Sequence, residues 1–86
     1  MKTIWKYSFR VADAVTIRMP KDARILTVQM QGVLPCIWAL VDEDAKREPR
    51  VFRVFGMGNP FDAEGWSYVG TFQDGQLVWH LFEVRL

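Results

Sequence analysis

The chain has 86 residues, of which half are hydrophobic and 14% aromatic, and 11 Lys and Arg nearly balance 10 Asp and Glu, so the net charge is +1. This length fits one domain with one core, and the near-neutral charge excludes a long-range attraction to nucleic acid or to an anionic membrane. The single cysteine, Cys36, excludes an intramolecular disulfide and a cysteine zinc cluster.

Short runs of alternating or fully apolar residues, separated by Gly, Pro and Asp, fill almost the whole chain. In chain order they cover 5–11, 15–19, 26–31, 34–41, 51–55, 66–73 and 77–84. Runs of this length with a period of two predict strands. We expect the first two strands to form a hairpin whose ladder stops at Pro20, because proline has no backbone donor.

Two connections between these runs carry signals of their own. Asp74-Gly75 stands between alternating runs and is typical of a tight β-hairpin. The charged segment 42–49 has no periodic apolar face, and it predicts a solvated hairpin loop, with a single helical turn as the alternative.

An antiparallel meander of about seven short strands must close on itself or stack in two layers, because open edges invite aggregation. The sequence therefore predicts an all-β fold, a single small antiparallel barrel or sandwich over residues 1–86. No apolar stretch approaches the roughly 18 residues of a membrane span, and the N-terminus lacks the apolar core of an export signal. We expect a cytoplasmic protein without membrane contact.

The runs 36–41 and 77–84 are apolar on both faces, which is unusual in so short a chain. Such strands lie at the centre of a fold or against a partner. We therefore expect a homodimer or a higher homo-oligomer, with Trp38, Trp79 and His80 as interface residues.

The sequence offers little that could carry catalysis. His80 is the only histidine and stands within an apolar strand, so neither a nucleophile and base nor a set of metal ligands is recognisable. The carboxylates stand mostly in predicted turns, where solvation explains them. We expect no enzymatic activity, no metal and no cofactor.

The segment 53–65 is the place where a small ligand is expected, if one binds. It is the longest irregular stretch, and its glycines let backbone amides approach an anion closely. The candidate ligand-binding residues are Arg53, Gly56, Gly58, Asn59 and Trp66. The alternative is that the glycines only permit a bend between two strands.

The high aromatic content raises the possibility of base stacking on nucleic acid. The aromatic residues alternate in core register and do not cluster with basic residues. Nucleic acid is therefore not an expected partner.

Several short motifs together resemble a family of small uncharacterised proteins encoded by tailed bacteriophages and prophages, and the resemblance covers essentially the whole chain. The motifs are Thr3-Ile4-Trp5-Lys6-Tyr7, Met19-Pro20, Pro35-Cys36-Ile37-Trp38-Ala39-Leu40-Val41-Asp42, Gly56-Met57-Gly58-Asn59-Pro60, Tyr68-Val69-Gly70-Thr71 and Val78-Trp79-His80-Leu81-Phe82-Glu83. The resemblance implies a phage accessory protein that acts in the host bacterial cytoplasm.

Three functions follow as hypotheses from the apparent origin and the lack of catalytic residues. The first is a binding protein that interferes with host defence, either by occupying a host protein or by sequestering a small signalling nucleotide. The second is a structural or assembly component of the phage, and the third is a small hydrolase.

Overall fold

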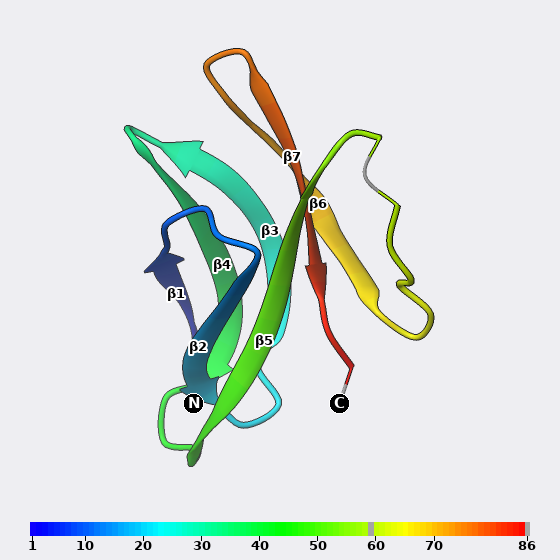
Figure 1. Ribbon diagram of the computed structural model, residues 1–86. Coiled ribbons are helices and arrows are strands. Elements are labelled where there is room, and N and C mark those ends of the chain that lie inside the picture. Colours follow the sequence, from blue (N-terminus) through cyan, green and yellow to red (C-terminus); the bar gives the residue numbers. More distant parts are fainter. Residues whose placement is uncertain (59, 86) are drawn as a thin grey trace.

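Seven antiparallel strands form two sheets (Figure 1). The structure is a computed structural model that describes residues 1–58 and 60–85. One sheet has the order β1-β4-β3, from Lys2–Ser8, Leu34–Asp42 and Arg24–Gln31; the other has the order β2-β5-β7-β6, from Ala14–Pro20, Arg47–Gly56, Leu77–Glu83 and Ser67–Asp74. The predicted all-β fold of about seven strands is confirmed, and the two sheets make it a sandwich. Within these ranges there is no helix that could cross a membrane.

The first two strands do not form the predicted hairpin. β1 pairs with β4, and β2 pairs with β5 in the other sheet. Between β1 and β2 the chain crosses from one layer to the other, and Phe9 is buried at this crossing, edge-on to Phe72 with ring centroids 6.0 Å apart. Alternation of polar and apolar residues tells which face of a strand is buried, but two strands with the same pattern can pair or lie in opposite layers.

The connection from β4 to β5 also changes sheets, so the predicted hairpin loop over 42–49 is wrong. β4 continues to Asp42 and β5 begins at Arg47, which leaves only the turn 43–46. The charged residues of this segment lie partly at the ends of the two strands and partly in the turn, and the sequence pattern did not separate the two.

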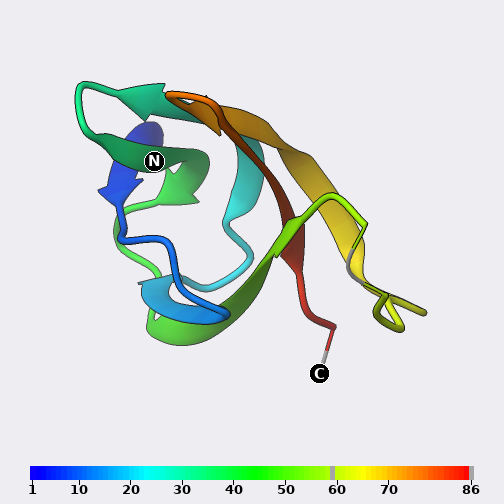
Figure 2. The same ribbon diagram turned by 45° about the horizontal axis from the view of Figure 1, so that its top comes forward.

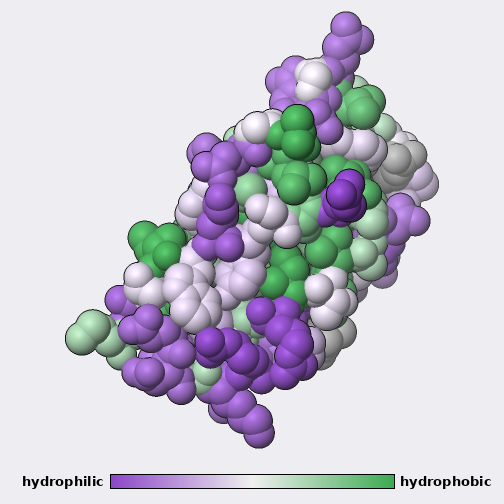
Figure 3. Space-filling model, turned by 90° about the vertical axis from the view of Figure 1, so that its left-hand side faces the viewer, coloured by the Kyte–Doolittle hydropathy of each residue, from purple (hydrophilic) through white to green (hydrophobic). Residues whose placement is uncertain are grey.

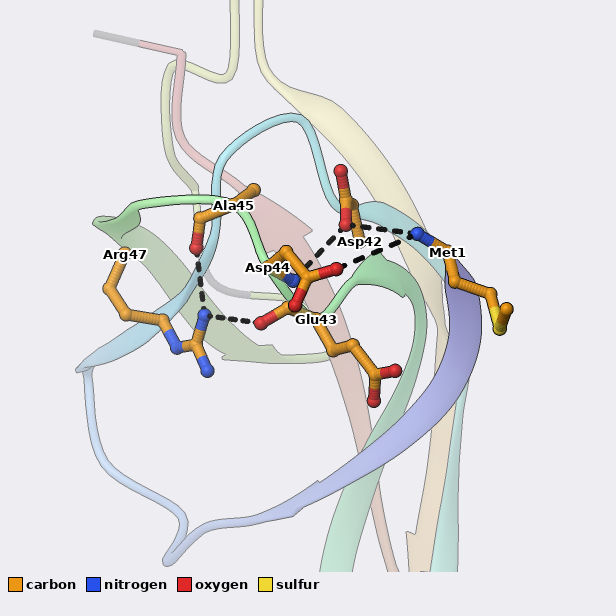
Figure 4. A network of polar contacts seen from close by, with 6 residues as sticks. All are labelled: Met1, Asp42, Glu43, Asp44, Ala45 and Arg47. Atoms are coloured by element: carbon orange, nitrogen blue, oxygen red, sulfur yellow. Dashed lines mark hydrogen bonds and ion pairs between the residues drawn. The ribbon is translucent and has the colours of Figure 1, made fainter.

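The turn 43–46 is held by its own hydrogen bonds (Figure 4). The backbone N–H of Asp44 donates to the Asp42 carboxylate at 3.1 Å, and the Arg47 guanidinium donates to the carbonyl oxygens of Glu43 at 3.3 Å and Ala45 at 2.8 Å. The backbone hydrogen bond from Asp44 is the main cause that lowers the pKa of Asp42 below its usual value. The turn is therefore short and well tethered.

The two true hairpins join neighbours in sequence, β3 to β4 and β6 to β7. The hairpin predicted at Asp74 is confirmed, but Asp74 pairs with Leu77, so its two loop residues are Gly75 and Gln76. Gly75 and Gly32 each occupy the first loop position with φ of 62°, the backbone conformation that the first central residue of a type II′ turn requires.

The core lies between the sheets, and β3 runs beside β6 at one side of the sandwich (Figures 1 and 2). The buried residues of the core are Phe9, Met19, Ala23, Val28, Ile37, Ala39, Val41, Phe52, Val54, Phe72 and Leu81. A Cβ at Gly70 would lie 3.1 Å from Cγ1 of Val28, so the absent side chain lets the two sheets approach closely there.

A partly buried ion pair lies near the end of β7, and one of its side chains also contacts the chain just before β3 of the other sheet. The Arg50 guanidinium makes a two-pronged contact with the Glu83 carboxylate and also donates to the carbonyl oxygen of Ala23 at 2.8 Å. Arg50 belongs to β5 and Ala23 precedes β3, so one side chain ties the two layers together.

Candidate functional site

An open groove of about 400 Å³ lies on the outer face of the four-stranded sheet. Phe52 and Val54 of β5 and Leu81 of β7 point into the core. Because side chains alternate along a strand, Phe55 of β5 and its paired residue His80 of β7 point outward. The groove is thus built on β5, β6 and β7, and the segment after β5 forms its rim.

The walls of the groove are aromatic. The rings of Phe55 and Phe61 are stacked with centroids 3.7 Å apart and planes 3° from parallel, and Phe61 remains 41% exposed. Phe82 lies edge-on to Phe61 at 5.3 Å and to Tyr68 at 5.2 Å. Phe61 belongs to the irregular segment between β5 and β6, so the stack anchors this segment to the sheet.

Arg53 and Trp66 stand behind this wall. The guanidinium carbon of Arg53 lies 5.2 Å from the centroid of Phe55 and 5.7 Å from that of Trp66, and neither residue lines the groove. The Nε–H of Arg53 donates to the carbonyl oxygen of Asp13 at 2.7 Å, which fixes its guanidinium against the two rings. The cation supports the aromatic wall from outside the groove.

A chain of three polar side chains forms the remaining wall. The hydroxyl groups of Tyr68 and Thr71 are hydrogen-bonded to each other, and Oγ1 of Thr71 lies 2.9 Å from Nδ1 of His80. A β-bulge between Tyr68 and Gly70 brings these groups together, because it turns two residues three positions apart toward the same face.

The hydrogen-bond chain is the part of the site that sequence reasoning missed. Strict alternation places Tyr68 and Thr71 on opposite faces of the strand, and only the bulge overturns that expectation. A glycine inside a strand pattern, here Gly70, is a known signal of a bulge and could have indicated it.

The structure distributes the predicted ligand-binding residues over two places. Gly56 and Gly58 line the groove, whereas Arg53 and Trp66 stand behind its aromatic wall. Asn59 lies outside the described residues.

The residues predicted at an interface are also spread over the molecule. His80 lines the groove, and Trp79 packs against the core. Trp38 is half-buried and lies on the outer face of the three-stranded sheet. On the side of the molecule where β1 lies, hydrophobic and hydrophilic residues are interspersed (Figure 3).

The described lining of the groove combines aromatic rings with uncharged polar groups and His80. Among the described residues no charged side chain lines it, and no three potential metal ligands cluster. Thr71 does lie beside the only histidine, but over the same ranges His80 makes no hydrogen bond to a carboxylate that would orient it as a catalytic base. The arrangement can stack a flat ring and offer polar groups to its edge.

Comparison with protein families gives one match, and it spans residues 1–86. The chain belongs to the family described as a domain of unknown function, DUF7352. The match covers the whole chain and agrees with the expected membership of an uncharacterised family. None of the curated proteins and none of the solved structures compared with the chain matches it.

Proposed function

We propose that this member of the family is a non-enzymatic binding protein whose groove holds a planar heteroaromatic ring, such as the base of a small nucleotide. The observation that carries the proposal is the combination of a stacked aromatic wall and a polar chain around one groove of about 400 Å³. Ligand sites are typically apolar concavities with a few placed polar groups, and this volume lies within their usual range.

The aromatic residues favour a flat ligand. Phe61 and Phe82 contribute ring surface to the groove, and stacking on aromatic side chains stabilises a bound base by about 1–3 kcal/mol. The absence of charged side chains among the described lining residues favours insertion of the ring, with any phosphate directed to solvent.

The resemblance to small phage proteins suggests the biological setting. A phage accessory protein in the host cytoplasm could act against a defence system by sequestering a small signalling nucleotide, and this is the role that we propose. It requires no chemical step, only an affinity high enough to lower the free concentration of the nucleotide.

The alternatives each have a weaker basis in the structure. Met57, 89% exposed at the rim, and the aromatic residues beside it are of the types enriched at protein interfaces, which favours contact with a host protein. Among the described residues, the feature that favours a hydrolase is the proximity of Thr71 to His80. No single observation favours a virion component.

The test is calorimetric titration of the full chain with cyclic AMP, cyclic GMP and cyclic UMP, followed by recovery of each nucleotide. We expect saturable binding with the nucleotide recovered intact. Phe61→Ala should weaken binding at least tenfold, because losing about 1.4 kcal/mol of stacking corresponds to a factor of ten.

Leu77→Ala is the matched control, because Leu77 is an exposed apolar residue that does not line the groove. It should leave affinity unchanged. Absence of binding at millimolar nucleotide would contradict the proposal, and conversion of a nucleotide during incubation would favour the hydrolase instead.

A further inference from the structure

The hydrogen-bond chain from Tyr68 through Thr71 to His80 has a direction, and the direction determines what the groove can recognise. We infer that these hydrogen bonds fix the imidazole of His80 with its proton on Nε2. The groove then selects bases that present a carbonyl oxygen to Nε2 over bases that present an amino group there. This inference rests on the proposed function, because it names the class of ring that the groove takes.

The direction follows from the chemistry of the three groups. A phenol, with an ordinary pKa near 10, is a stronger hydrogen-bond donor than an aliphatic alcohol, and an unprotonated imidazole nitrogen is the best acceptor of the set. Each hydroxyl carries one proton. Tyr68 therefore donates to Oγ1 of Thr71, and Thr71 donates its proton to Nδ1 of His80.

The opposite direction combines poorer partners. If His80 donated from Nδ1 to Thr71, Thr71 would either donate to the phenolic oxygen of Tyr68, whose lone pair is delocalised into the ring, or accept both hydrogen bonds and leave its own proton without a partner among the described residues. The bulge keeps all three groups on one face, and Thr71 is directly paired with His80 across β6 and β7. The backbone of the two strands therefore holds the three hydrogen-bonded side chains in place.

The consequence for recognition lies at the second ring nitrogen. With Nδ1 accepting, neutral imidazole carries its hydrogen on Nε2, where it is a donor. Nε2 has no hydrogen-bond partner in the part of the chain that the structure describes, and His80 lines the groove. A base stacked on the aromatic wall gains a hydrogen bond if it presents a carbonyl oxygen to the Nε2–H of His80. An amino group at the same position would place its own donor against the Nε2–H and form no hydrogen bond.

Two pairs of nucleosides test this selection because the members of each pair differ mainly by an oxo or an amino group at the same ring position. The full chain should bind inosine about five- to tenfold more tightly than adenosine, and uridine more tightly than cytidine by a similar factor. Thr71→Val keeps the shape but removes both hydrogen bonds, and it should reduce both preferences to nearly one.

The tautomer itself can be measured without any ligand. Because the chain has a single histidine, the nitrogen-15 resonances of one imidazole report its state without overlap. In the neutral form of this imidazole we expect a protonated Nε2 and an unprotonated Nδ1. Phe61→Ala should leave this pattern intact, because Phe61 does not belong to the hydrogen-bond chain.

The outcomes separate the two proposals. An imidazole protonated on Nδ1, or equal binding of oxo and amino nucleosides by the wild-type chain, would overturn the selection and leave the binding function standing. If neither member of either pair binds while Nε2 is protonated, the proposed function fails and the selection that rests on it fails with it.

Discussion

Tyr7 carries the one buried side-chain polar atom that lacks a hydrogen-bond partner among the described residues. It stands on the inward face of β1, opposite Ile37 of β4. Burial raises the pKa of Tyr7 above its ordinary value of 10.0, and the charge of Arg47 opposes part of this rise. A hydroxyl removed from water without a new partner costs free energy on folding.

Replacing this tyrosine should therefore not weaken the protein. We expect Tyr7→Phe to increase the free energy of unfolding by about 1 kcal/mol at neutral pH, measured by urea denaturation. Tyr68→Phe is the control, because the Tyr68 hydroxyl is exposed and has a partner, and it should give no such gain. A clear loss of stability in Tyr7→Phe would show that the hydroxyl is bound, for example by an internal water.

The same variant should change the alkaline limit of stability. Because the folded-state pKa of Tyr7 is raised, the unfolded chain ionises first as the pH increases. The part of the stability that depends on the ionisation of Tyr7 is fully present below the unfolded value near 10.0 and is lost as the pH rises through the folded value. Tyr7→Phe should therefore lose less stability above about pH 10 than the wild type.

At the level of single residues, sequence reasoning indicated the segment that forms the rim of the groove but not the polar wall of the groove. Gly56 and Gly58 were expected near a ligand and do line the groove. The role of Thr71 depends on one extra residue in β6, and a period of two cannot show where a strand departs from it.

The irregular segment between β5 and β6 and the β6–β7 hairpin should differ in resistance to proteases. Chymotrypsin can cut at Phe61 and Trp66, and the glycines at 58 and 65, with φ of 88° and 79°, mark irregular backbone. We expect the first cuts in 57–66, detected by mass spectrometry at low protease concentration.

Two comparisons give this experiment its controls. Trypsin should cut more slowly at Lys46, because the turn 43–46 is short and tethered. Dominant early cleavage within β6 or β7 would contradict the paired hairpin that the structure shows.

At the level of elements, the strands were predictable and most of their pairings were not. Tight turns such as the one at Gly75 reveal which neighbours pair, because loop length and turn type set the register. The partners of β1 and β2 lie far away in the sequence, so only the packing of the two layers selects them.

At the level of the whole molecule, the outer face of the three-stranded sheet retains apolar side chains that the sandwich does not fully cover. β4 is the centre of its sheet, which explains why Ile37 and Val41 are buried, but Trp38 on the outer face is only half-buried. Near it Ile4 is 56% exposed. This face is where the predicted self-association would bury an aromatic anchor.

We expect sedimentation to show a homodimer at tens of micromolar protein. Trp38→Ala should weaken association by about 2 kcal/mol, the size typical of an interface hot spot. Trp79→Ala is the contrast, because Trp79 packs against the core and its loss should lower the melting temperature more than the association. A monomer at every concentration would remove the prediction.

The all-β class followed from composition and period, because seven short strands in a small chain must share one core, but the choice between a barrel and a sandwich came only from the structure. The order of strands within the layers did not follow from them. A doubly apolar strand such as β4 predicts a central position, but it does not identify the two neighbours that flank it.

The pairing of β1 with β4 also has a consequence for the order in which the strands can pair during folding. During synthesis, β1 has no partner until residues 34–42 have followed it, and β5 lacks β7 until residues 77–83 have followed. Among the described residues, the β3–β4 and β6–β7 hairpins are the local pairings, so we expect them to form early, while closing the long loops delays the other pairings. In that interval Trp5 and Tyr7 are exposed on an unpaired strand, which leaves β1 open to capture by chaperones or to aggregation.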